Sequence, residues 1–127
     1  MSNQTHGAPT VGGIRAIEAI YAIGHMLLEQ QRATEAAKVF RVMLRLVPED
    51  ERGWLGLGAC HEELDDLSIA AELYGTGWTV AKPPSTECLM ALSRVLRMNG
   101  DTVLADECIA EAHGIADEMA HELGGVR

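Results

Sequence analysis

Two places in the chain put reactive or phosphate-binding residue types close together, and neither arrangement suits catalysis. Cys60 and His61 are neighbours in a helical stretch, where adjacent side chains point about 100° apart and cannot act as a nucleophile and its base. Gly56 and Gly58 lie in the middle of the same stretch, where a phosphate cannot reach backbone N–H groups. We therefore expect no enzyme activity, and we interpret Cys60 as a small buried side chain.

One set of side chains has the spacing of metal ligands. His113, Asp117 and His121 follow one another at steps of four, which places them on one face of a helix. The segment is acidic, and Gly114 weakens the helix or breaks it. A solvated helix face is the preferred interpretation, so we expect no metal and no cofactor.

The elements that carry these residues are predicted to be helices of one small domain. The chain has 127 residues, a hydrophobic content of 47% and only 4% aromatic residues. This mixture packs well as helices and poorly as a β-sandwich, so the expected fold class is all-α. The formal net charge of −9 argues against nucleic acid as a partner, because phosphates would be repelled.

The cysteines and the N-terminal residues indicate the cellular compartment of the protein. Three scattered cysteines are too few for a disulfide framework. The first residues have neither the basic nor the apolar region of a secretory signal, and no run approaches the eighteen or so consecutive apolar residues that span a membrane. We expect a cytoplasmic protein in a reducing compartment, without membrane insertion.

Apolar residues recur at helical spacing from Ile14 onwards. Residues 1–13 are predicted to be a flexible N-terminus, and residues 14–127 a single domain. Pro48 ends the second helix, Asp50 caps the third, and further breaks fall at 65–66, 82–85 and 99–101. Six helices result, and residues 114–123 either extend the sixth or form a short seventh.

The chain is similar to itself at a shift of 34 residues. This shift places Gly24 on Gly58, Ala36 on Ala70 and Phe40 on Tyr74, and a further shift of 35 leads to Ser93, Ala105 and Ile109. Small residues let paired helices approach closely, and the bulky residue fills the gap to the next pair. Three helix–turn–helix units are predicted, at about 17–50, 51–84 and 86–119. Their length and pattern resemble the tetratricopeptide repeat.

The resemblance implies a right-handed solenoid of helical hairpins with a concave groove and a C-terminal capping extension. The first helix of each repeat lines the groove, and the residues implied to face it are Glu18, Tyr21, His25 and Leu28, then Arg52, Leu55, Ala59 and Glu62, then Glu87, Met90, Arg94 and Arg97. The apolar members predict pockets for an apolar peptide, and Arg94 and Arg97 are candidates to hold a carboxylate or carbonyls. The alternative is that these side chains only cover one another.

A narrower resemblance follows from residues 54–60. Their sequence, WLGLGAC, closely resembles the FLGLGAC segment of class II chaperones of bacterial type III secretion systems. Those small, acidic, cytoplasmic proteins keep pore-forming translocators soluble and hold an extended translocator segment in the groove. They are often homodimers, and some regulate gene expression. Tyr21 matches a groove aromatic of that family, Leu55 and Ala59 match its groove wall, and His25 and Leu28 replace two further aromatics.

Two other functions remain open at this stage. Chaperones of the needle subunit are also small tetratricopeptide proteins, and they hold an amphipathic helix. A general interaction scaffold would join two partners without protecting either. The basic stripe of Lys38, Arg41 and Arg45 and the acidic segment after Met98 are interpreted as solvated helix faces, with pairing between subunits as the alternative.

Overall fold

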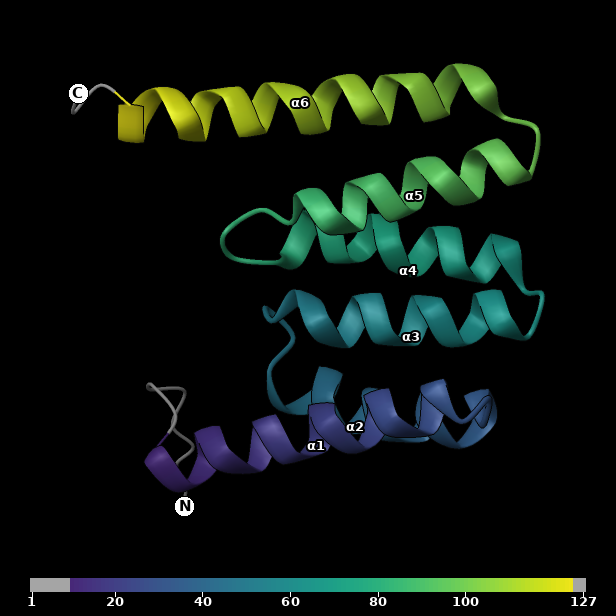
Figure 1. Cartoon of the computed structure of the whole chain (residues 1–127), viewed down its shortest axis with the longest axis vertical. Helices are drawn as coiled ribbons and strands as arrows, with labels where there is room; N and C mark the ends of the chain where they lie inside the picture. Colours follow the sequence, from purple (N-terminus) through teal and green to yellow (C-terminus); the bar gives the residue numbers. More distant parts are fainter. Residues whose placement is uncertain (1–9, 125–127) are drawn as a thin grey trace.

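The computed structural model describes residues 10–124, and every regular element in that range is an α-helix. The helices are α1 (Val11–Glu29), α2 (Ala33–Leu46), α3 (Glu51–Glu63), α4 (Leu67–Val80), α5 (Thr86–Met98) and α6 (Thr102–Gly124). Consecutive helices run antiparallel and stack into a column (Figure 1). The predicted all-α architecture of three helical hairpins is confirmed.

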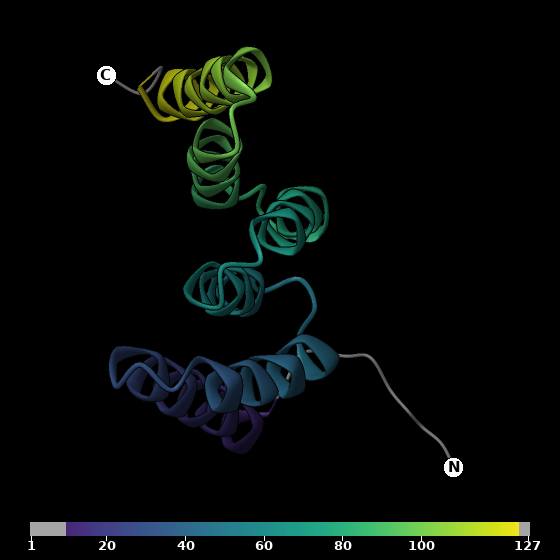
Figure 2. The ribbon, with the colours of Figure 1, turned by 90° about the vertical axis from the view of Figure 1, so that its right-hand side faces the viewer.

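The first helices of the three hairpins share one side of the column. Helix α3 contacts α1 and α5 as well as its sequence neighbours. Figure 2 shows α3 and α5 on one side of the column and α4 on the other. The wall formed by α1, α3 and α5 is therefore the surface on which the predicted groove residues lie.

The element boundaries agree with the predicted breaks, with two differences at the ends. Helix α1 begins at Val11, earlier than Ile14, because Thr10 caps it by accepting a hydrogen bond from the Gly13 N–H at 3.0 Å. Residues 11–13 of the expected flexible segment are thus helical, and residues 1–9 lie outside the described range. Helix α6 continues through Gly114, and its C-terminal part extends past α5 (Figure 1).

By length and composition alone, α1 is the one helix between residues 10 and 124 that could cross a membrane. The prediction that no segment spans a membrane rests on uninterrupted apolar runs, whereas the apolar sequence of α1 is interrupted by Arg15 and Glu18. Ile17, Gly24 and Leu27 of α1 are buried. The helix therefore forms half of the first hairpin.

The repeat register has a direct steric basis in the core. The ring of Phe40 lies so close to Gly24 and Gly56 that a Cβ atom there would be 2.8 and 2.3 Å from ring atoms. Tyr74 lies in the same way against Gly58, where a Cβ would be 2.3 Å from the ring. In α2 and in α4, an aromatic side chain thus fills the space that a glycine leaves, which confirms the positions aligned in the sequence for the first two hairpins.

The third hairpin uses a different contact at these positions. Ser93 is buried and donates a hydrogen bond from its Oγ to the carbonyl oxygen of Ala105 at 2.9 Å. Ile109 occupies the place of Phe40 and Tyr74 and is only half-buried. Ala105, like Ala36 and Ala70, has no exposed surface, so a small buried residue in the second helix of the hairpin (α2, α4 or α6) is common to all three hairpins.

Candidate peptide-binding groove

Most of the predicted groove residues gather at two separate hollows on the inner wall. One hollow, of about 380 Å³, lies along α1 and is lined by Glu18, Tyr21 and His25 together with Ala22, Met26 and Glu29. The other, of about 780 Å³, lies between α3, α5 and α6. We call them the Tyr21 hollow and the α3–α5 pocket.

Arg52 of α3 contacts two residues of the Tyr21 hollow, Glu18 and Tyr21. Its two terminal nitrogens donate to the carboxylate oxygens of Glu18 at 2.9 and 2.8 Å. The same guanidinium donates to Asp50 at 3.0 and 2.7 Å, and its central carbon lies 4.8 Å from the centre of the Tyr21 ring. The hydrogen bonds from Arg52 lower the pKa of both Glu18 and Asp50. Arg52 is thus fully engaged and lies over the ring.

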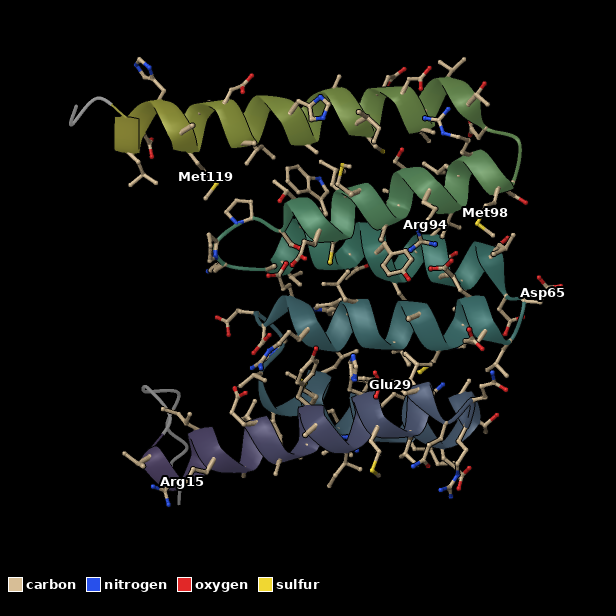
Figure 3. All side chains as sticks on the ribbon, in the orientation of Figure 1. Arg15, Glu29, Asp65, Arg94, Met98 and Met119 are labelled. Atoms are coloured by element: carbon tan, nitrogen blue, oxygen red, sulfur yellow. The ribbon has the colours of Figure 1, made fainter. Side chains whose placement is uncertain are left out.

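The α3–α5 pocket is mainly apolar. The predicted residues that line it are Leu55, Glu87, Met90, Arg94 and Arg97, and the residues that the repeat positions did not indicate are Thr86, Ala91, Ser93, Met98 and Ile109. Met90 and Met98 are exposed (Met98 is labelled in Figure 3), so their flexible side chains face the space without being fixed by packing.

Two of the missed residues, Met98 and Ile109, had partial indications in the sequence. Met98 ends its helix one position after the last residue that the repeat assigns to the groove. Ile109 stands at the aromatic position of the repeat, where the alignment indicates a core role. Because it is smaller than Phe or Tyr, it leaves part of the space open and becomes a wall of the pocket.

The groove arginines of α5 are held by carboxylates of the chain itself. Arg94 (Figure 3) pairs with Glu62, and the other oxygen of that carboxylate accepts a hydrogen bond from the Tyr74 hydroxyl at 2.5 Å. Burial, together with this hydrogen bond, raises the pKa of Tyr74. Arg97 donates to Asp106 of α6 at 2.9 Å. A ligand carboxylate would have to replace Glu62 or Asp106, so this predicted role stays a prediction.

Four predicted groove residues line neither hollow: Leu28, Arg52, Ala59 and Glu62. Arg52 and Glu62 take part in the ion pairs described above. Leu28 is half-buried and packs against the core of the first hairpins. Ala59 is half-buried on α3, and in the sequence it lies between the groove residues of α1 and those of α5. The groove is consequently discontinuous, with a small polar end at α1 and a larger apolar end at α5.

The other candidate residues occupy ordinary structural positions. Cys60 and Cys88 are fully buried, and burial raises the pKa of each thiol to about 11. Nδ1 of His61 lies 3.3 Å from Asp66. His113, Asp117 and His121 are exposed on α6, and residues 10–124 contain no group of three side chains placed to hold a metal ion.

The charged stripe predicted on the second helix is also exposed. Lys38, Arg41 and Arg45 lie on the solvent side of α2 and form no ion pair with any residue of the described range. Their interpretation as a solvated face stays a prediction.

Three stacked helical hairpins with a hollowed inner wall define a tetratricopeptide-repeat domain. The tetratricopeptide-repeat domain of Arabidopsis FLU has a similar fold, with a TM-score of 0.70 and 17% identity over 82% of this chain and 97% of that one. The structure of PcrH in complex with the chaperone binding region of PopB has a TM-score of 0.73 and 24% sequence identity, and the match covers 82% of this chain and 83% of that one. The structure of the Yersinia enterocolitica type III secretion chaperone SycD with a peptide of the translocator YopD has a TM-score of 0.72 and 22% sequence identity. The match covers 89% of this chain and 86% of that one.

A relative at the sequence level agrees with these structures. Low calcium response locus protein H of Yersinia pestis is 29% identical over 101 residues, which are 75% of this chain. The chain spans 60% of the length of that curated relative. No family model matches the chain. The resemblance to class II translocator chaperones, drawn from residues 54–60, is confirmed by these similarities.

Proposed function

We propose that this protein is a chaperone of a bacterial type III secretion system, which binds an extended apolar segment of a translocator protein and keeps that client soluble before export. The observation that carries the proposal is the apolar α3–α5 pocket on the inner wall of the repeats. The similarity to PcrH and SycD, whose structures contain segments of PopB and YopD, supports it. The role is that of a binding protein in the cytoplasm without enzyme activity.

The physical properties of the groove suit reversible binding of an apolar segment. Burying about 300 Å² of apolar ligand surface contributes about 7 kcal/mol before the costs of ordering and association. That is enough to hold a segment that would otherwise aggregate, yet it permits later release. The net charge of −9 keeps the complex soluble. No nucleotide is required for either step.

The first test is purification of the tagged full-length chain from its native host with mass-spectrometric identification of partners. A stoichiometric partner with membrane-inserting segments, whose soluble yield rises on co-expression, is the expected result. A small helical needle-like subunit would replace the proposal with the needle-chaperone alternative, and a partner whose yield is unchanged would indicate a scaffold. Light scattering of the same sample distinguishes a monomer from the homodimer that is common in the chaperones this chain resembles.

The second test places the client in the groove. The double variant Tyr21→Ala with Leu55→Glu is expected to lose the client while it keeps its helical circular dichroism. Because Leu55 also packs against the core of the second and third hairpins, Met90→Glu is the companion variant at an exposed pocket residue. Ile69→Glu, an exposed apolar position on α4, is the matched control. Undiminished binding by folded pocket variants would refute the groove.

A further inference from the structure

The two hollows of the groove are unequal, and the difference assigns a preferred ligand. We propose that the α3–α5 pocket is the anchor of the groove: it receives one large apolar side chain of an extended partner segment that carries a basic residue beside it, facing Glu87. The Tyr21 hollow contributes little to the binding of this ligand. This inference rests on the proposed function, because it names the ligand chemistry of the same groove.

In the Tyr21 hollow, a side chain of the protein itself already covers one face of the Tyr21 ring. The Arg52 guanidinium lies over the Tyr21 ring at 4.8 Å and is held there by carboxylates on both sides. A ligand that stacked on this face of the ring would have to displace Arg52 and leave Glu18 and Asp50 without their partner. The anchor is therefore expected elsewhere.

The α3–α5 pocket has the opposite character. Leu55, Met90, Met98 and Ile109 surround open space of about 780 Å³, which exceeds the volume of any single side chain. Met90 and Met98 have 42% and 59% of their surface exposed, so a ligand that covers them gains apolar burial without breaking an existing contact. Unbranched methionines also adapt to different apolar shapes.

The charges at the rim select the residues beside the anchor. Arg94 and Arg97 are neutralised by Glu62 and Asp106. Glu87 lines the pocket, is exposed, and forms no ion pair with any other residue between 10 and 124. The net charge of −9 adds a field of the same sign. A lysine or arginine beside the apolar side chain is therefore favoured, and an acidic residue is disfavoured.

Methionine methyl groups allow the two hollows to be compared in one experiment. Met90 and Met98 report on the α3–α5 pocket, Met26 reports on the Tyr21 hollow, and buried Met43 is the internal control. The full-length protein, labelled with ¹³C at methionine methyl groups, is titrated to millimolar concentration with capped ten-residue Ser/Ala peptides. One peptide has a central leucine with a lysine two positions away on each side, the second has glutamates in place of the lysines, and the third lacks the leucine.

The expected result is that the leucine–lysine peptide shifts the Met90 and Met98 methyl signals and leaves Met26 and Met43 unmoved. The glutamate peptide should bind at least fivefold more weakly, and the peptide without leucine should cause no shift. Glu87→Gln should reduce the preference for lysine at least twofold. Glu63→Gln, which removes the same charge from an exposed site outside the pocket, should leave that preference unchanged.

Three outcomes would overturn the inference: a shift of Met26 in place of Met90 and Met98, equal binding of the lysine and glutamate peptides, or the same effect of Glu87→Gln and Glu63→Gln. If no methyl signal responds to any peptide, the anchor is also refuted. The proposed function is judged separately by the co-purified client. A translocator recovered with the protein would support it even where the anchor fails.

Discussion

The first two hairpins and the third fill the space between their helices in different ways. In the first two, Phe40 and Tyr74 each fill the space beside glycines that leave no room for a side chain. In the third, Ser93 and Ala105 are joined by a hydrogen bond, and Ile109 is half-buried beside an open pocket. The regular part of the repeat is therefore full, and the irregular part has space for a ligand.

This contrast shows where a repeat protein of this kind can vary. A position that closes the core in two repeats forms a pocket wall in the last, because no fourth hairpin follows within the described range to pack on it. Close packing stabilises the first hairpins, and its relaxation creates the apolar cavity of the third.

The largest expected effect is steric. Gly58→Ala places a Cβ 2.3 Å from the Tyr74 ring, so the ring or the two helices must move. We expect the free energy of unfolding to fall by about 2 kcal/mol, despite the better helix propensity of alanine. Urea denaturation followed by circular dichroism measures the change.

Gly114→Ala is the matched control in the third hairpin. A Cβ at this position on α6 would meet no atom within 4 Å. The helix propensity of alanine should then raise the free energy of unfolding by about 0.5–1 kcal/mol. Equal effects of the two substitutions would show that the first hairpins are no more tightly packed than α6.

The next effect depends on pH. Burial raises the pKa of Cys60 and Cys88 to about 11 from an ordinary value of 9.0, so the folded state holds these protons more tightly than the unfolded state. Their contribution is complete below pH 9 and is lost as the pH rises towards 11, by about 2 kcal/mol per thiol. Urea midpoints measured from pH 8 to 11 should fall, and less steeply in the double variant Cys60→Ala with Cys88→Ala.

Cys108 provides the comparison with α6, the last helix of the stack, whereas Cys88 lies on α5 of the same hairpin. Its surface is 8% exposed, whereas Cys60 and Cys88 have no exposed surface. In the native protein a thiol reagent such as dithiobisnitrobenzoate should therefore modify Cys108 first, and Cys108→Ala should abolish the fast phase. Simultaneous reaction of all three thiols would contradict the difference in packing.

A third effect separates the two ends of the groove by client affinity. Met90→Glu puts a charge into the apolar pocket and should weaken client binding at least tenfold. Tyr21→Ala removes a ring that Arg52 already covers and should change affinity less than twofold. Isothermal titration with the co-purified client measures both, and a larger loss for Tyr21→Ala would reverse the order of the two hollows.

The sequence predicts the fold in detail and the site only in part. Gly24, Gly58, Phe40 and Tyr74 have side-chain sizes that specify the repeat register, because close packing permits few alternatives. The division of the groove depends instead on side-chain conformations. Nothing in the repeat positions indicates that Arg52 turns towards Glu18 and Asp50 and over Tyr21, since several acidic partners are available to it in the sequence.

Leu28 and Ile109 illustrate the same limit for apolar residues. The repeat pattern assigns Leu28 to the groove and Ile109 to the core, whereas Leu28 packs against the core and Ile109 lines the pocket. The period of a helix indicates a face but not which of two neighbouring residues at its edge is covered. Three-dimensional packing decides that choice.

The smallest expected effect tests the closed end of the groove. Arg52→Ala removes the ion pairs with Glu18 and Asp50, whose exposed and partly exposed side chains limit their value, so the free energy of unfolding should fall by at most about 1 kcal/mol. The same change uncovers the Tyr21 ring, so the Met26 methyl should now respond to the leucine–lysine peptide. Arg32→Ala, which breaks an exposed pair with Glu35 away from both hollows, is the control and should leave Met26 silent. If Met26 stays silent in Arg52→Ala as well, Arg52 does not close this hollow, and its small volume of about 380 Å³ is what excludes the ligand.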